Sequence, residues 1–147
     1  MGSKQSMSYT VLGDTVNIAS RLKGASKQYG IQSLITEETK ELIDGIIELR
    51  EIDLIRVVGK ETPVRVYGLL GIKDEVPASR LQLRDAFERA LDAYRNMRWD
   101  RALQHFETCQ KLHANDGPTK EYINRVNTLQ KDPPDNDWDG VWSLTQK

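Results

Sequence analysis

The chain has 147 residues, of which 38% are hydrophobic and 29% charged, a balance typical of a folded, water-soluble protein. Its formal net charge of −1 gives no reason to expect nucleic acid or an anionic membrane as a partner. No apolar run approaches the roughly 20 residues of a membrane span, and no signal peptide is visible. We expect a cytoplasmic chain in a reducing compartment, with the single cysteine, Cys109, as a small core residue.

The first predicted elements are a strand over 8–12 and a helix that ends near Gln28. Asp14 or Thr15 is placed to cap the start of this helix. Gly30 lies just beyond its end, where glycine is a common stop signal. The pattern therefore predicts a strand, a tight turn and a helix in succession.

Asn17 and Arg21 are the first candidate site residues. They are four residues apart, about one helical turn, so both side chains are expected on one face of the predicted helix. An amide and a guanidinium on one face, just after a strand end, can hydrogen-bond and charge-stabilise a phosphate ester. On spacing alone, the alternative is an ordinary helix amide and a surface arginine.

Four further elements follow before residue 72. They are a strand over 32–35, a helix over 37–42, a strand over 46–58 and a strand over 63–70. Thr36 is placed to cap the helix, and Gly59 and Lys60 form the turn between the two longer strands. Strands that alternate with helices and close on a hairpin predict an α+β sandwich.

The composition changes near residue 72. The expected elements are a linker over 72–80, a helix pair over 81–112 with a join at 96–100, and a third helix over 116–130. Pro77 favours the linker, and Pro118 is tolerated in the first turn of the third helix. The turn-rich tail, residues 132–147, contains Trp138 and Trp142, so we expect it to dock against the rest of the chain.

Residues 9–21, YTVLGDTVNIASR, closely resemble the signature of the second half of the catalytic domain of class III nucleotidyl cyclases. The resemblance covers residues 1–71 and implies a partial ferredoxin-like cyclase half-domain. It implies that Asn17 positions the ribose oxygen of the substrate and that Arg21 stabilises charge developing on the α-phosphate. The implied reaction is in-line attack by the ribose 3′-oxygen, with pyrophosphate leaving.

The resemblance also implies contacts to the base and the triphosphate. Thr10 matches the position that contacts the purine edge, which favours ATP over GTP; on residue type alone it is a common strand residue. The triphosphate-binding lysine of the family precedes a glycine, and Val58 stands at that place here. Lys60 and Arg56 are the candidate substitutes, although the ordinary interpretation of Lys60 is a solvated turn lysine.

Class III cyclases bind two divalent ions, Mg²⁺ or Mn²⁺, through two aspartates in the first half of the domain. The similarity starts after those positions, so we expect no metal ligand in this chain and no activity from it alone. Family members are dimers with sites at the interface, so a second cyclase protomer or a swapped copy is the expected partner.

Met1 matches an internal position of the family, which predicts a fragment. His105 and His113 lack neighbouring ligands and predict no metal site.

The predicted helices, residues 81–131, resemble a tetratricopeptide-like hairpin. Ala90, Trp99, Ala102 and Phe106 match the packing positions of such a pair. Together with the tail, the helices resemble the C-terminal extension of bacterial membrane-anchored adenylate cyclases, in which a sensor and membrane helices lie upstream.

Two alternatives remain open at this stage. In the first alternative, the chain would be a non-enzymatic interaction or regulatory module built from a degenerate half-domain and a helical hairpin. Val58 and the absent metal aspartates favour this alternative. Alternatively, the helices merely cover the exposed sheet of the half-domain, which would explain the tail tryptophans without any partner.

Overall fold

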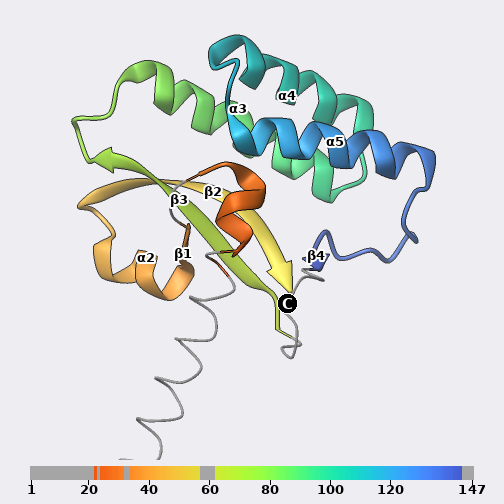
Figure 1. Cartoon of the computed structure of the whole chain (residues 1–147), viewed down its shortest axis with the longest axis horizontal. Coiled ribbons are helices and arrows are strands. Elements are labelled where there is room, and N and C mark those ends of the chain that lie inside the picture. The colour runs from red at the N-terminus through yellow and green to blue at the C-terminus, as the bar shows by residue number, and fades with distance from the viewer. Residues whose placement is uncertain (1–21, 23, 32–33, 57–61, 144–147) are drawn as a thin grey trace, which may run out of the picture.

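A computed structural model describes residues 22, 24–31, 34–56 and 62–143 of the chain. The described elements in chain order are helical residues 24–29, β1 (Leu34–Thr36), α2 (Glu37–Ile43), β2 (Ile47–Arg56), β3 (Val64–Ile72), α3 (Ala78–Arg95), α4 (Trp99–Leu112), α5 (Gly117–Lys131) and β4 (Trp142–Ser143). The expected α+β class is therefore confirmed (Figure 1).

The sheet has the strand order β1-β3-β2-β4. β3 is antiparallel to both β1 and β2, whereas the short β4 pairs parallel to β2. The register of β2 against β3 shifts between Glu51 and Asp53. Such an irregularity re-aims side chains, and here both Ile52 and its neighbour Asp53 are buried. This shift matters because it brings a carboxylate into the interior.

Local signals in the sequence explain where several elements begin and end. Thr36 caps α2, and its hydroxyl accepts a hydrogen bond from the backbone N–H of Thr39. Gly30 follows the helical residues 24–29 with a φ of +67°, a conformation that glycine adopts without strain. Asp116 caps α5, with Pro118 in the first turn. The predictions for Thr36, Gly30 and Pro118 are confirmed.

The helices lie on both sides of the sheet. Figure 1 shows α3, α4 and α5 on one side, and α2 beside β1 and β3 on the other. Side chains alternate along a strand, so neighbouring residues of β3 face opposite sides of the sheet. Val66 is fully buried in the core shared with the larger helices, whereas the ring of Tyr67 lies under the Lys40 ammonium of α2, 4.9 Å from its centroid.

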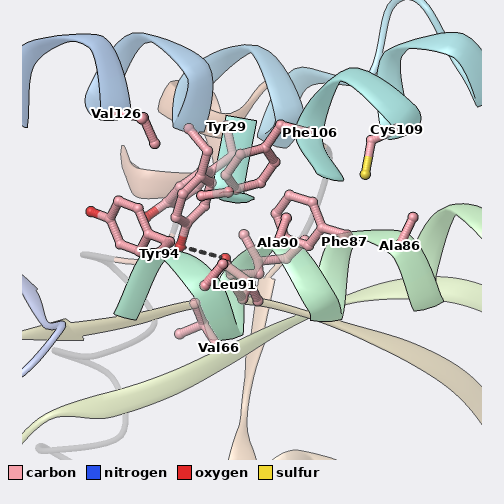
Figure 2. Packing of buried hydrophobic residues seen from close by; sticks show 14 of the residues in the cluster. Tyr29, Val66, Ala86, Phe87, Ala90, Leu91, Tyr94, Phe106, Cys109 and Val126 are labelled. Atoms are coloured by element: carbon pink, nitrogen blue, oxygen red, sulfur yellow. Dashed lines mark hydrogen bonds between the residues drawn. The ribbon is translucent and has the colours of Figure 1, made fainter. Parts of the chain in front are cut away.

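One hydrophobic core joins the sheet to the helices of the C-terminal part. Figure 2 shows Val66 of β3 beneath side chains of α3, α4 and α5. The rings of Phe87, Phe106 and Tyr122 come from the three helices, and their centroids lie 5.3 to 5.6 Å apart. Cys109 is buried in the same core, as expected. The helices therefore bury the sheet face that Ile52, Ile55 and Val66 would otherwise expose.

Element bounds differ from the expected ones by a few residues. β1 extends to Thr36, β3 extends to Ile72, and α3 begins at Ala78 rather than near Leu81. The first turn of α3 is polar, so its apolar periodicity starts later than the helix itself. The expected strand over 8–12 and the turn at 59–60 lie outside the described residues.

Candidate functional site

The residues predicted to carry chemistry are Thr10, Asn17, Arg21 and Lys60, and all four lie outside the described residues. Their roles therefore stay predictions. The first described residue, Leu22, directly follows Arg21 in sequence, and residues 24–29 are helical. Because the sequence predicts one helix through to Gln28, residues 24–29 form the C-terminal part of that predicted helix.

This short helix has one buried face. Leu22, Ala25, Ser26 and Tyr29 are all buried, at the spacing i, i+3, i+4 and i+7 that places residues on one side of a helix. Residues 24, 27 and 28 are exposed. The rotation of the helix about its own axis is therefore fixed by packing.

Tyr29 belongs to a buried polar group that we call the Arg125 cluster, made of Tyr29, Asp53 and Arg125. Arg125 Nη1 donates to Asp53 Oδ2 at 2.7 Å, and Nη2 donates to the Tyr29 hydroxyl oxygen at 3.0 Å. The Tyr29 hydroxyl in turn donates to the same Asp53 oxygen. The second carboxylate oxygen accepts from the backbone N–H of Leu54 at 2.7 Å. The cluster thus ties together three elements: the short helix, β2 and α5.

The Arg125 cluster holds a buried arginine–carboxylate ion pair, and Arg125 Nε also lies 3.4 Å from a carboxylate oxygen of Glu121. Burial raises the pKa of Tyr29, and the adjacent Asp53 carboxylate raises it further, so the hydroxyl keeps its proton. Burial alone would lower the pKa of Arg125, but the Asp53 carboxylate and the surrounding tyrosines raise it overall. The guanidinium also lies over the rings of Tyr122 and Trp142, 4.7 and 4.0 Å from their centroids. One positive and one negative charge therefore face each other away from water.

A second buried ion pair fastens the start of α5 to β2. Arg50 donates to both carboxylate oxygens of Asp116, at 2.7 and 2.6 Å, and the Thr119 hydroxyl donates to Asp116 at 2.6 Å. Burial would raise the pKa of Asp116, but the hydrogen bonds and charge of Arg50 lower it overall. The Arg50 guanidinium also lies 4.1 Å from the centroid of the Phe87 ring. A bidentate arginine–carboxylate pair fixes orientation as well as distance.

The backbone of α5 also touches the end of the short helix directly. A Cβ atom at Gly117 would overlap the carbonyl oxygen of Tyr29 and would lie 3.2 Å from Cα of Gly30. Nearby, the Gln28 side chain donates to Glu121 of α5 at 2.9 Å. Only glycine permits this approach, so α5 and the short helix meet without intervening side chains.

The tail lies across the end of the helices, as its tryptophans predicted. Trp138 packs edge-on against Tyr94, with ring centroids 5.4 Å apart, and Trp142 packs against the core. Arg56, the candidate substitute for a phosphate-binding lysine, ends β2 and pairs with Asp139 of the tail at 2.9 Å. The Arg56 guanidinium is therefore engaged by a carboxylate.

The described part of the chain carries neither a metal-binding cluster nor a membrane-spanning helix. Among residues 22, 24–31, 34–56 and 62–143, no group of three or more His, Cys, Asp or Glu side chains could hold a metal ion. None of the helices in these ranges combines the length and apolarity needed to span a bilayer.

Burial raises the pKa of the Cys109 thiol to about 11, which makes it a poor nucleophile. A shallow hollow between α3 and α4 is lined mainly by charged residues, among them Asp85, Glu88, Arg98 and Arg101.

The residues of the two buried ion pairs were not predicted from the sequence. One signal was present: Asp53 interrupts an apolar strand pattern, and Arg125 lies between the apolar positions Tyr122 and Val126 of a helix. A charged residue at a core position of a periodic pattern indicates burial with a partner. Its partner, however, lies 72 residues away along the chain.

Three curated proteins named adenylate cyclase are similar to the chain. The terminal-differentiation specific adenylate cyclase of Dictyostelium discoideum is 32% identical over 129 residues, which are 85% of this chain and 6% of that protein. Adenylate cyclase 1 of Rhizobium meliloti (strain 1021) is 32% identical over 72 residues, 49% of this chain and 11% of that protein. The adenylate cyclase of Anabaena cylindrica is 43% identical over 61 residues, 40% of this chain and 12% of that protein.

These matches establish a relationship to adenylate cyclases over part of their length. The chain spans between 6% and 12% of the proteins it matches. The similarity to the Dictyostelium protein covers 85% of the chain, so it extends past residue 71 into the helical part. No protein-family model and no solved structure matches the chain.

Proposed function

We propose that the chain is the C-terminal part of the catalytic domain of a class III adenylate cyclase, together with a helical extension, and that it acts in the cytoplasm. The similarity to three proteins named adenylate cyclase carries the proposal. The α+β arrangement of the described residues and the cyclase-like sequence of residues 9–21 support it. In this proposal residues 1–71 are the catalytic portion and residues 81–131 are the extension.

The proposed reaction converts ATP to cyclic AMP and pyrophosphate. The ribose 3′-hydroxyl gives its proton to water and its oxygen bonds to the α-phosphorus, while the bond from that phosphorus to the bridging oxygen of the β-phosphate breaks and pyrophosphate leaves. Asn17 would hold the ribose oxygen, and Arg21 would stabilise the charge that develops on the α-phosphate. Thr10 would contact the adenine edge, and Lys60 the triphosphate.

The proposal implies Mg²⁺ or Mn²⁺ in the intact enzyme. The described part of the chain holds no cluster of side chains that fits such an ion, so no step is assigned to a metal site in this chain. A second cyclase protomer, or a preceding part of the same protein, would supply the ligands. The Asn17 and Arg21 half-site would then be completed across an interface.

The test is formation of cyclic AMP from ATP with Mn²⁺, by this chain alone and by the longest native polypeptide that contains it. We expect activity in the longer polypeptide and none in the chain alone. Arg21→Ala in the longer polypeptide should lower kcat by about 100-fold, the usual effect of removing one donor from a developing oxyanion. Arg101→Ala, which removes an exposed arginine of α4, is the matched control.

Two results would contradict the proposal. Absence of cyclic AMP from the longer polypeptide with both ATP and Mn²⁺ would remove the assigned activity. Full activity of Arg21→Ala would leave the activity in place but remove the role of that arginine. Replacing ATP by GTP separately tests the base preference assigned to Thr10. We expect a lower kcat/KM with GTP than with ATP.

A further inference from the structure

We propose that Arg125 and Tyr29 are positioning residues for the nucleotide chemistry: the helical extension holds the helix that follows Asn17 and Arg21 in place. This inference rests on the proposed function. It makes the extension a working part of the catalytic unit rather than a separate appendage. Its basis is the Arg125 cluster and the close approach of Gly117, both among the described residues.

The contacts constrain the short helix in different directions. Burial of Leu22, Ala25 and Tyr29 on one face sets its rotation. The approach of the Gly117 backbone to the Tyr29 carbonyl blocks movement toward α5. Hydrogen bonds weaken steeply as their angle departs from linearity, so the bonds from Tyr29 to Asp53 and from Arg125 to Tyr29 resist sliding along the axis.

The chemistry of the cluster explains why these contacts position the helix as well as stabilise it. An apolar core tolerates side chains of similar volume in several arrangements, and it loses uniqueness before it loses stability. A buried ion pair with a shared hydroxyl keeps its hydrogen bonds over a narrow range of geometries, because an unpaired charge in the interior is costly. Asp53 is fully buried and Arg125 is 3% exposed, so water cannot replace a lost partner.

Small movements of this helix should change the rate. A misplacement of about 1 Å can lower a rate by about 100-fold where catalysis depends on positioning. The sequence predicts that Asn17 and Arg21 lie on the same helix as Tyr29, two to three turns before it. A loosened Tyr29 should therefore lower kcat while leaving the KM for ATP nearly unchanged.

The experiment compares Tyr29→Phe with Tyr122→Phe. Each variant removes one hydroxyl from a fully buried tyrosine that donates a hydrogen bond. The Tyr122 hydroxyl donates to the Ile52 carbonyl at 2.8 Å, so it joins α5 to β2 without a bond to the short helix. We expect kcat for cyclic AMP formation by the longest native polypeptide to fall about 10-fold in Tyr29→Phe. In Tyr122→Phe it should stay within about twofold of the wild type.

Arg125 supplies a second pair of variants. Arg125→Lys keeps the charge beside Asp53, and Arg125→Met removes it while keeping an unbranched chain. We expect Arg125→Lys to retain more activity than Arg125→Met, at temperatures where circular dichroism shows both variants folded. If Arg125→Met does not fold, the tyrosine pair still decides the question.

A second measurement does not depend on activity. Hydrogen exchange of peptides covering residues 17–29 should be about 10-fold faster in Tyr29→Phe than in Tyr122→Phe. If the wild type makes no cyclic AMP, the proposed function fails, and exchange alone tests whether Tyr29 anchors this segment. If the wild type is active and the two tyrosine variants lose kcat equally, or neither does, the positioning role is wrong and the proposed function stands.

Discussion

Arg125 of α5 and Asp53 of β2 form an ion pair of 2.7 Å in which the side chains are 2% and 1% exposed. The pair joins β2 of the sheet to α5, which lie 72 residues apart along the chain. Two charges leave water to form it, and they are compensated by each other, by the Tyr29 hydroxyl and by the backbone of Leu54. Such a pair is costly to break on one side only.

Arg125→Met should lower the free energy of unfolding by about 3–5 kcal/mol, because it leaves the Asp53 carboxylate buried without its cation. Adding Asp53→Asn to this variant should recover part of the loss, since the amide oxygen still accepts from Tyr29 and no charge remains. Urea denaturation followed by circular dichroism measures both effects. Arg84→Ala breaks a more exposed pair with Glu48 and should cost at most about 1 kcal/mol. Equal losses for Arg84→Ala and Arg125→Met would contradict this account.

Gly117→Ala should destabilise the chain by about 1–3 kcal/mol, because the new methyl group would overlap the Tyr29 carbonyl oxygen. Gly24→Ala is the matched control on the short helix, since no atom lies within 4 Å of a Cβ placed there. There alanine should be neutral or stabilising by up to about 1 kcal/mol, through helix propensity. Thermal unfolding of the two variants distinguishes steric overlap from a general intolerance of substitution.

A chain that ends at Gly71 should fail to fold as a soluble monomer. The shared core would lose Phe87, Phe106 and Tyr122, and Asp53 would lose its partner Arg125. A chain that ends at Asp132 keeps α3, α4 and α5, loses the docked tryptophans and should stay folded at reduced stability. Size-exclusion chromatography and circular dichroism report the outcome. Cooperative unfolding of a monomeric 1–71 chain would show that the extension is an independent unit.

Acid should weaken the Arg50–Asp116 pair. The pKa of Asp116 in the folded chain lies below the ordinary value of 3.8, so its stabilising effect is complete above that pH and is lost as pH falls through the folded value. Between pH 5 and pH 2 we expect the wild type to lose more stability than Asp116→Asn, measured as urea midpoints across the range. Asp139 also has a lowered pKa, from its hydrogen bond with Arg56, but its side chain is half exposed. Asp139→Asn should therefore change the acid dependence less.

Much of the architecture follows from local features of the sequence. Capping residues such as Thr36 and Asp116, and the glycine stop at Gly30, act within one helical turn, so their effects can be recognised without tertiary structure. The apolar spacing of the helices indicates their buried faces for the same reason. Two tryptophans in a polar tail predicted docking because large aromatic surfaces are rarely left in water. The predicted site at Asn17 and Arg21 also came from the sequence alone, and it remains a prediction.

The pairing of buried charges was decided only by the tertiary structure. The parallel contact of β4 with β2, the meeting of Arg125 with Asp53, and the approach of Gly117 to Tyr29 all join segments far apart along the chain. A single arginine or aspartate in a periodic pattern does not identify its partner, because charge attraction and shape act through space and not along the sequence. The sequence determined which elements form and which faces they bury; the packing of α5 against the sheet determined which of their polar residues meet.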